Sequence, residues 1–313
     1  MGDKTGISWT SATWNPVTGC VKVSPGCKHC YAERDWGRLA HLPAYAGRAF
    51  TDVACHEDRL DQPLRWNRPR MIFVNSMSDL FHEDVPDEFI DRVFAVMALA
   101  KKHVFQVLTK RPERMRRYMA RLGESAKLLD AGARTMGYTF EHGGQYFVSW
   151  PIPNVWLGVS VENQETADER IPLLLQTPAA VRWISAEPLL GPVDLAEVPV
   201  GMHGPLRPYQ DKPSQPRLDW VVVGGESGAK ARPMHLQWAR NLRDQCETAG
   251  VPFFFKQTGL WQMLEPGDAG ETEHQDKAVR WSPDLNASFL KTKGGGSELL
   301  DSVEHKAWPR RMV

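Results

Sequence analysis

The sequence predicts an α/β protein, a partial or complete TIM-like (β/α) barrel of about six to seven mostly parallel strands. Three observations support this fold class. Short apolar runs rich in β-branched and aromatic residues recur along the chain, most of them precede a helical pattern, and the alternation continues over most of its length. Unbroken apolar runs are typical of strands buried on both faces, as in a parallel sheet.

The predicted strands begin with "ATWNPVTG" at residues 12–19. Six clearer runs follow: "MIFVNS" (71–76), "HVFQVLTK" (103–110), "VWLGVSVE" (155–162), "VRWISAE" (181–187), "DWVVVGG" (219–225) and "PFFFKQ" (252–257). These runs end in polar or glycine residues. Chemistry in a barrel of parallel strands gathers at the carboxyl ends, so a functional site is expected there.

Helical patterns lie between these strands. Segment 86–102 opens with proline and acidic residues and closes with lysines, which suits the helix dipole. Segments 111–122 and 235–250 are similar, and the second of them ends in a glycine suited to a C-cap. A further helix is expected within 167–176, interrupted by Pro172.

One domain is predicted for residues 1–260, because the strand–helix rhythm runs through it. Two stretches break that rhythm and are interpreted as insertions, at about 123–154 and 196–217. Residues 261–313 contain many acidic residues and a "KGGGS" run, so they are predicted to form a peripheral C-terminal tail.

Lys plus Arg and Asp plus Glu number 38 each, so the formal net charge is zero. This balance gives no overall attraction to nucleic acid, although a local basic face is compatible with it. No apolar segment follows a basic N-terminus, and no apolar run approaches the roughly 20 residues that span a bilayer. We therefore expect a cytoplasmic protein without a membrane partner.

The odd number of five cysteines argues against a disulfide framework.

Three of the cysteines fall within one short stretch: Cys20, Cys27 and Cys30. Their spacing is C-x6-C-x2-C, and clustered cysteines in a reducing compartment indicate a metal or redox site. A structural zinc ion normally takes four ligands, and His29, Cys55 or Cys246 could supply the fourth. A [4Fe–4S] cluster also normally takes four cysteines, but with three of them one iron stays open for an external ligand. That open position favours a reactive centre held by the three cysteines.

The run "GCKHCYAE" resembles the second half of the cysteine motif of radical S-adenosylmethionine (SAM) enzymes, in which an aromatic residue such as Tyr31 often adjoins the third cysteine. The blocks "ISWTSATWNPVTGCVKVSPGCKHCYAE", "NSMSDLFHEDVP", "FQVLTKRPERM" and "GGESG" together resemble a phage-associated, radical SAM-like three-Cys-motif family. The match covers most of residues 7–260, and a more distant resemblance is to the spore photoproduct lyases. The first cysteine gap is longer here than the C-x3-C that is usual in the superfamily.

This resemblance implies a barrel of the radical SAM type that holds a [4Fe–4S] cluster and S-adenosylmethionine. In that superfamily the open iron binds the amino and carboxylate groups of SAM. An electron from the reduced cluster then cleaves SAM, and the resulting radical abstracts hydrogen from a substrate. The resemblance also implies a reductant protein such as a flavodoxin or ferredoxin, a nucleic acid or nucleotide substrate, and a three-Cys-motif partner protein.

Polar residues beside the third cysteine and at the strand ends are the candidate cofactor-binding groups: Tyr31, Ser76, Ser78, Asp79, Lys110, Ser160, Glu162 and Asn163. Ser76, Ser78 and Asp79, which follow the second predicted strand, suit the ammonium or ribose of SAM. Lys110 suits its carboxylate, and Ser160, Glu162 and Asn163 suit the ribose hydroxyls. Several have structural alternatives. Ser78, Asp79 or Glu162 could cap a following helix. Lys110 could be a solvated lysine, and Arg111 is an equally basic competitor.

Lys110, Glu187 and Glu226 are the candidate catalytic residues. Glu187 precedes a proline at a strand end, where a core role is hard to explain. Glu226 belongs to "GGE", which resembles the superfamily element that holds the SAM ammonium but follows a later strand here. It is therefore interpreted as facing the substrate or lying close to SAM. Lys256 reaches the same rim from the last strand.

The function predicted from these observations is that of a radical SAM enzyme acting on a nucleobase or nucleic acid. The alternative is a zinc-stabilised nucleic-acid-binding protein without catalytic activity. Iron and sulfide in the purified protein indicate the radical SAM enzyme, whereas zinc at one ion per chain indicates the zinc-stabilised binding protein.

Overall fold

The computed structural model describes residues 5–142, 145–146, 148–200, 204–206, 216–264, 279–285, 287–292 and 296–309. Its central feature is a seven-stranded sheet: β1 (Ala12–Trp14), β4 (Met71–Val74), β5 (Val104–Thr109), β8 (Val155–Ser160), β9 (Val181–Ala186), β10 (Trp220–Gly224) and β11 (Phe253–Gln257). The strands lie in the order in which they occur along the chain, and every neighbouring pair is parallel.

This consecutive order distinguishes the sheet from a doubly wound one, in which the order reverses at a switch point. The sheet curls into a half-barrel, with β1 at one edge and β11 at the other. The predicted fold class, with about six to seven parallel strands in a partial barrel, is confirmed.

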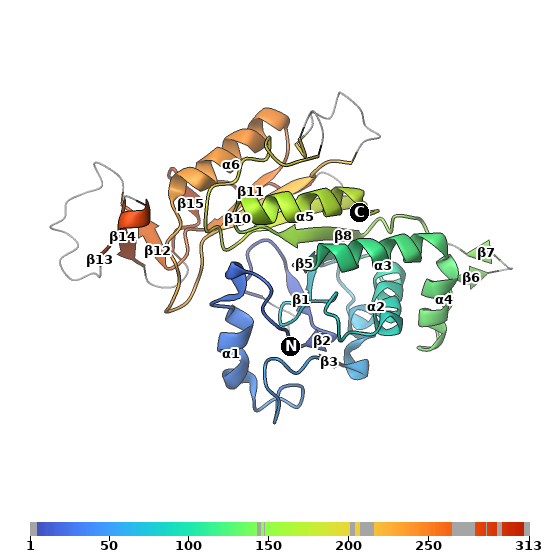
Figure 1. Ribbon diagram of the computed structural model, residues 1–313. Coiled ribbons are helices and arrows are strands. Elements are labelled where there is room, and N and C mark those ends of the chain that lie inside the picture. The colour runs from blue at the N-terminus through green and yellow to red at the C-terminus, as the bar shows by residue number, and fades with distance from the viewer. Residues whose placement is uncertain are drawn as a thin grey trace.

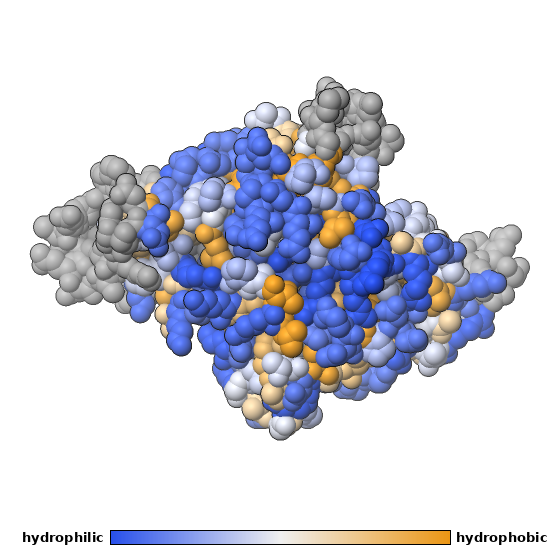
Figure 2. Space-filling view, in the orientation of Figure 1, coloured by the Kyte–Doolittle hydropathy of each residue, from blue (hydrophilic) through white to orange (hydrophobic). Residues whose placement is uncertain are grey.

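Helices cover one face of this sheet, and Figure 1 shows α3 (Pro112–Glu124), α5 (Gln164–Gln176) and α6 (Leu236–Ala249) on its near side. With α2 (Asp87–Leu99) they confirm the helices predicted between the strands. One detail of the prediction is wrong, because α5 begins before residue 167 and continues through Pro172. A capping box between Asn163 and Thr166 stabilises its first turn. Figure 2 shows mainly hydrophilic side chains over the outer faces of these helices.

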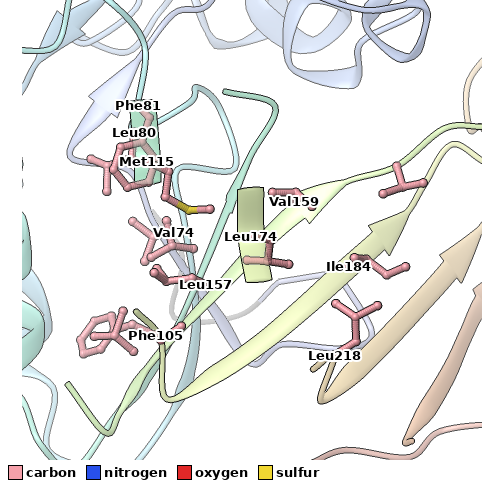
Figure 3. Close-up of a cluster of buried hydrophobic side chains, with 14 of the residues drawn as sticks. Val74, Leu80, Phe81, Phe105, Met115, Leu157, Val159, Leu174, Ile184 and Leu218 are labelled. Atoms are coloured by element: carbon pink, nitrogen blue, oxygen red, sulfur yellow. The ribbon is translucent and has the colours of Figure 1, made fainter. Parts of the chain in front are cut away.

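Side chains alternate between the two faces of the strands, and each face has its own core. On the helix side, Val74, Leu157 and Ile184 pack toward Leu174 of α5 (Figure 3). On the opposite face, inside the half-barrel, a second cluster contains four tryptophans: Trp9, Trp156, Trp183 and Trp220. Burial on both faces explains why the strands are unbroken apolar runs.

The tryptophan cluster fills the interior of the half-barrel below the carboxyl ends of the strands. The rings of Trp9 and Trp183 lie 5.2 Å apart between centroids, and those of Trp183 and Trp220 lie 5.4 Å apart. Gly158 makes room for them, because a Cβ atom there would lie 2.5 Å from Trp183 Cε2.

Shorter elements surround the half-barrel. They are β2 (Val17–Thr18), η1 (Pro25–Cys27), α1 (Tyr31–Leu39), β3 (Ala54–Cys55), η2 (Glu57–Arg59), η3 (Gln62–Arg65), α4 (Ala126–Arg134), β6 (Glu141–His142) and β7 (Gln145–Tyr146). The predicted insertion 123–154 contains α4, β6 and β7, and much of 196–217 lies outside the described residues. No helix in the described part of the chain is both long and apolar enough to span a membrane.

The C-terminal region adds β12 (Trp261–Met263), β13 (Val279–Ser282), η4 (Pro283–Leu285), β14 (Ala287–Lys291), β15 (Leu299–Leu300) and β16 (Val303–Glu304). The strands β12, β14 and β13 form a small antiparallel sheet. Beyond them the chain returns to the half-barrel, where Lys306 forms a bridge with Phe254 of β11 and Trp308 packs on the Phe254 ring. The described end of the chain therefore lies against the free edge of the main sheet.

Candidate active site at the carboxyl edge of the sheet

A cavity of about 590 Å³ opens at the carboxyl ends of the parallel strands. Every strand from β4 onward in the main sheet contributes a polar side chain to it: Ser76, Lys110, Ser160, Glu187, Glu226 and Lys256 are examples. Most of them lie an even number of residues after a member of the tryptophan cluster in the same strand. Lys256, for example, comes two residues after Phe254, which also belongs to that cluster. They therefore face the interior of the half-barrel, above the tryptophan cluster, as the strand period requires.

The three clustered cysteines all line this cavity. Cys20 follows β2, Cys27 closes η1, and Cys30 immediately precedes α1. None of the three forms a disulfide. The two alternatives proposed for a fourth thiolate lie elsewhere, Cys55 in β3 and Cys246 buried within α6, and neither lines the cavity.

Contacts from several strand ends hold the loop that carries the first two cysteines. Ser24 Oγ donates to Glu162 Oε1 at 2.8 Å, and Arg232 Nη1 donates to the carbonyl of Pro25 at 3.0 Å. Gly26 packs so closely on Glu162 that a Cβ atom would lie 2.4 Å from Oε1. Gly19 has a positive φ of 92°, a conformation that favours glycine. Most of the residues between Cys20 and Cys27 therefore line the cavity in a defined conformation.

The surroundings of Cys20 and Cys30 favour the protonated thiol, since the pKa of each is raised. Burial, reinforced by the Asp79 carboxylate, raises the pKa of Cys20 to about 12, although Arg111 opposes this shift. Burial also raises the pKa of Cys30, against the first-turn N–H groups of α1 and the Lys110 ammonium. As the side chains stand, no three His, Cys, Asp or Glu residues within the described ranges are grouped to hold a metal ion. The chemistry of the donors nevertheless fits a thiolate-ligated group, because three sulfurs share one cavity with cations beside them.

Lys110 belongs to a buried ion-pair network. Its Nζ donates to Glu162 Oε1 at 2.6 Å, and Arg170 Nη1 donates to Glu162 Oε2 at 3.1 Å. Burial of the fully enclosed Glu162 acts to raise its pKa, but the two cations outweigh this effect and lower it. Glu162 is therefore an ionised anchor behind Lys110 and does not itself line the cavity.

Asp79 is a second buried anchor. Its Oδ1 accepts from Thr109 Oγ1 at 2.7 Å and from the main-chain N–H of Phe81, and its Oδ2 accepts from the N–H of Lys110 and from Arg111. These four donors occupy both oxygens, so Asp79 ties the segment after β4 to the segment after β5.

Two further ion pairs occupy the side of the cavity formed by β9, β10 and β11. Lys256 Nζ lies 2.5 Å from Glu187 Oε1. Glu226, which is buried, accepts two bonds from the Arg232 guanidinium, at 2.6 and 2.9 Å. Glu187, Lys256 and Glu226 line the cavity, whereas Arg232 does not.

The structure brings most of the predicted site residues together. In addition to the cysteines, the cavity is lined by Tyr31, Ser76, Ser78, Asp79, Lys110, Ser160, Glu187 and Glu226. Three of these hydroxyls have main-chain or side-chain partners: Tyr31 donates to the Ser76 carbonyl at 2.5 Å, Ser76 to Asn15 Oδ1, and Ser78 to the Val17 carbonyl.

Glu162 and Asn163 are absent from the cavity wall. Asn163, and not Glu162, caps α5. The alternative that Ser78 or Asp79 caps a helix is wrong, because α2 begins only at Asp87 after a Pro86 cap. The contribution of all these residues to cofactor binding stays a prediction.

The sequence reasoning missed Ser185, Arg34 and Arg232, and assigned Arg111 only as a competitor of Lys110. Ser185 lies two residues before Glu187, so strand alternation could have placed it on the cavity side. No local signal could have found Arg232, because its position depends on the loop after β10 folding onto the cysteine loop.

One family model and several solved structures match the chain. No curated protein matches it. Solved structures of spore photoproduct lyase do: a complex with dinucleoside spore photoproduct at 10% identity and a TM-score of 0.41, and a mutant with bound AdoMet and dinucleoside spore photoproduct at 10% and 0.42. Each match covers 93% of this chain and 71% of the matched lyase chain. A similarity this low is not evidence for a shared activity. A family model described as "Protein of unknown function (DUF5131)" matches residues 4–309, and the chain belongs to that family.

Proposed function

We propose that the protein is a radical SAM enzyme that binds a [4Fe–4S] cluster through Cys20, Cys27 and Cys30. One observation carries the proposal: these three cysteines line a single cavity together with the charged residues of the strand ends. A structural zinc site would be closed by a fourth protein ligand. Neither Cys55 nor Cys246 lines the cavity, so neither supplies a fourth thiolate, and a group with one position left for an external ligand is proposed. His29 does line the cavity, so zinc held by the three cysteines and His29 is the alternative that metal analysis distinguishes.

When bound, the cluster and SAM supply one-electron cleavage of SAM and hydrogen abstraction from a substrate. The chain's own residues bind and orient. Lys110, fixed by Glu162, lies beside Cys30 and is proposed to pair with the SAM carboxylate. Ser76 and Ser160 are proposed to contact the polar groups of SAM, and the tryptophan cluster closes the floor of the cavity against water.

The opposite side of the cavity is proposed to receive the substrate, a nucleobase or nucleic acid. The pair Glu187–Lys256 places an acceptor next to a donor at the cavity wall, and Glu226 adds a second acceptor there. This pattern is complementary to the adjacent N–H and C=O groups on the edge of a nucleobase. Glu187 and Glu226 are thus proposed as acceptors for the substrate. In the cell, a flavodoxin or ferredoxin is proposed to supply the electron.

Metal analysis after anaerobic purification tests the class of protein. We expect iron and sulfide, both lost when Cys20, Cys27 and Cys30 are changed to Ala. Cys55→Ala with Cys246→Ala should retain iron, since neither thiol lines the cavity. Zinc at one ion per chain, or iron unchanged in the triple variant, would refute the proposal.

Activity is tested on the iron-loaded protein with dithionite as reductant. Slow formation of 5′-deoxyadenosine from SAM is expected without any substrate. A single-stranded oligonucleotide should accelerate it, and Glu187→Gln or Glu226→Gln should remove the acceleration while keeping the basal rate. Acceleration that survives in both variants would exclude these carboxylates from the substrate side.

A further inference from the structure

Arg111 is a buried cation in direct contact with the first cysteine. It follows β5 and its side chain is only 5% exposed. Its Nη1 donates to Cys20 Sγ at 3.7 Å, and its Nη2 donates to the carbonyl of Val21 at 3.4 Å. Within the described residues, no other guanidinium makes a hydrogen bond to a cysteine sulfur.

Two carboxylates hold this guanidinium in place. Its Nε donates to both oxygens of Glu83, at 2.9 and 3.2 Å, and its Nη1 also donates to Asp79 Oδ2 at 3.2 Å. Asp79 is itself fixed by Thr109 and by the main chain of Lys110. Arg111 lines the cavity, but its planar guanidinium is held in one orientation by these carboxylates, with its remaining N–H groups directed at residues 20 and 21.

Lys110 and Arg111 therefore have different surroundings although they are adjacent in sequence. Lys110 reaches toward Glu162 and the cavity, whereas Arg111 reaches toward the backbone and sulfur of the cysteine loop. The loop needs such a contact because its six-residue gap leaves Cys20 far along the chain from the other two cysteines. Ser24 and Pro25 have their own contacts further along the loop, from Glu162 and Arg232.

We propose that Arg111 is a positioning residue that fixes Cys20 and raises the reduction potential of a cluster bound there. This inference rests on the proposed function. On reduction, one electron passes from the external reductant, a flavodoxin, a ferredoxin or dithionite, to the cluster, and no bond breaks. An N–H donor on a ligating thiolate stabilises the added negative charge, and such hydrogen bonds help to set cluster potentials.

The first experiment is a redox titration of iron-loaded protein, followed spectroscopically and without SAM. For Arg111→Gln, the ratio of reduced to oxidised cluster at a fixed ambient potential should fall about tenfold, a shift of ~59 mV for one electron. The matched control is Arg114→Gln, in the first turn of the helix α3 that follows Arg111. Its guanidinium binds the carbonyls of His82 and Val85 and touches no cysteine, so the potential should not change.

Arg111→Gln leaves the Asp79 carboxylate buried without its cation, and the variant could unfold for that reason alone. The double variant Arg111→Gln with Asp79→Asn removes both charges, and its reference is Asp79→Asn alone, because loss of the Asp79 carboxylate near Cys20 raises the potential by itself. Relative to Asp79→Asn, the double variant should show the same fall, and an unchanged potential between these two variants, at full iron loading, overturns the inference.

A second readout uses the metal-free protein and needs no cluster. Hydrogen exchange at the amides of residues 18–27 should be faster in the double variant than in wild type, and unaffected in Arg114→Gln. Unchanged exchange would overturn the positioning of Cys20. If the wild-type protein binds no iron at all, the proposed function fails, whereas this exchange experiment still decides whether Arg111 fixes the loop.

Discussion

Lys110 and Lys256 provide a matched pair of cations at the same edge of the sheet. Each side chain is 19% exposed, and each is paired with one carboxylate, Glu162 or Glu187. If SAM binds beside the cysteines, Lys110→Met should weaken SAM binding by about 1–3 kcal/mol, the range for a charge-assisted hydrogen bond. Lys256→Met should leave SAM affinity unchanged. Calorimetric titration of SAM into both variants measures the difference.

The pairing of Lys110 also changes what its removal does to the fold. A lysine without a partner would be expected to affect ligands alone, but Lys110→Met leaves the fully buried Glu162 with Arg170 and Ser24. A fall in melting temperature is therefore expected along with the loss of SAM affinity. Affinity per folded molecule equal to that of wild type would remove Lys110 from the cofactor site.

The raised pKa values of the cysteines predict a pH dependence of cluster assembly. The pKa of Cys20 is raised to about 12 and that of Cys30 is raised as well, so both thiols must lose a proton when iron binds. Below these pKa values, each such thiol should increase the apparent affinity for iron roughly tenfold per pH unit. Iron loading at limiting iron should therefore rise from pH 6.5 to pH 8.5. Proton release in weakly buffered solution is the direct check, and loading that is independent of pH would contradict it.

At the scale of elements, the six strands from β4 to β11 in the main sheet were predictable because each is a continuous apolar run. The helix α1 was not predicted. It begins directly after Cys30, and its first residues were interpreted as part of the cysteine motif and not as the start of a helix. Pro172 was expected to interrupt α5, but the capping box and the buried face of that helix outweigh the cost of one proline. Local propensity alone could not show this balance.

The cap of α5 yields a prediction that separates structure from cofactor binding. Asn163 Oδ1 accepts from the N–H of Thr166 at 3.1 Å, so Asn163→Ala should lower the free energy of unfolding by about 1 kcal/mol. Asn163→Asp retains the acceptor and should keep the stability. Chemical denaturation of both variants, with SAM titrations in parallel, gives the answer. A stable Asn163→Asp protein with reduced SAM affinity would support the ribose-binding role instead.

At the scale of the whole molecule, the edge of the sheet that carries the site was predictable, because parallel strands bring their carboxyl ends together. The partners of each site residue were not. Glu162 meets Ser24 and Arg232 meets Pro25, at sequence separations of 138 and 207 residues. Such contacts depend on how loops of different strands fold over the cavity, and no local pattern in one sequence encodes them.

The C-terminal residues also connect to the whole fold, and this leads to a last prediction. The N–H of Phe255 donates to the carbonyl of His305, and Trp220 Nε1 donates to the carbonyl of Ala307 at 2.8 Å. Trp308 lies 5.1 Å from Phe254, between ring centroids, and packs against the tryptophan cluster inside the half-barrel. Its loss would expose the floor of that cluster and the free edge of β11.

Trp308→Ala should therefore lower the free energy of unfolding by about 2 kcal/mol, less than a fully buried tryptophan would cost because the ring is only half-buried. Val303→Ala, in the same segment but with a 53% exposed side chain, is the control and should change stability little. Iron loading per folded molecule should be equal in both variants, since Trp308 lies away from the cysteines at the opposite end of the strands from the cavity. Denaturant unfolding followed by tryptophan fluorescence measures the first effect. If Trp308→Ala is as stable as wild type, residues 296–309 are a peripheral tail and contribute nothing to the stability of the half-barrel.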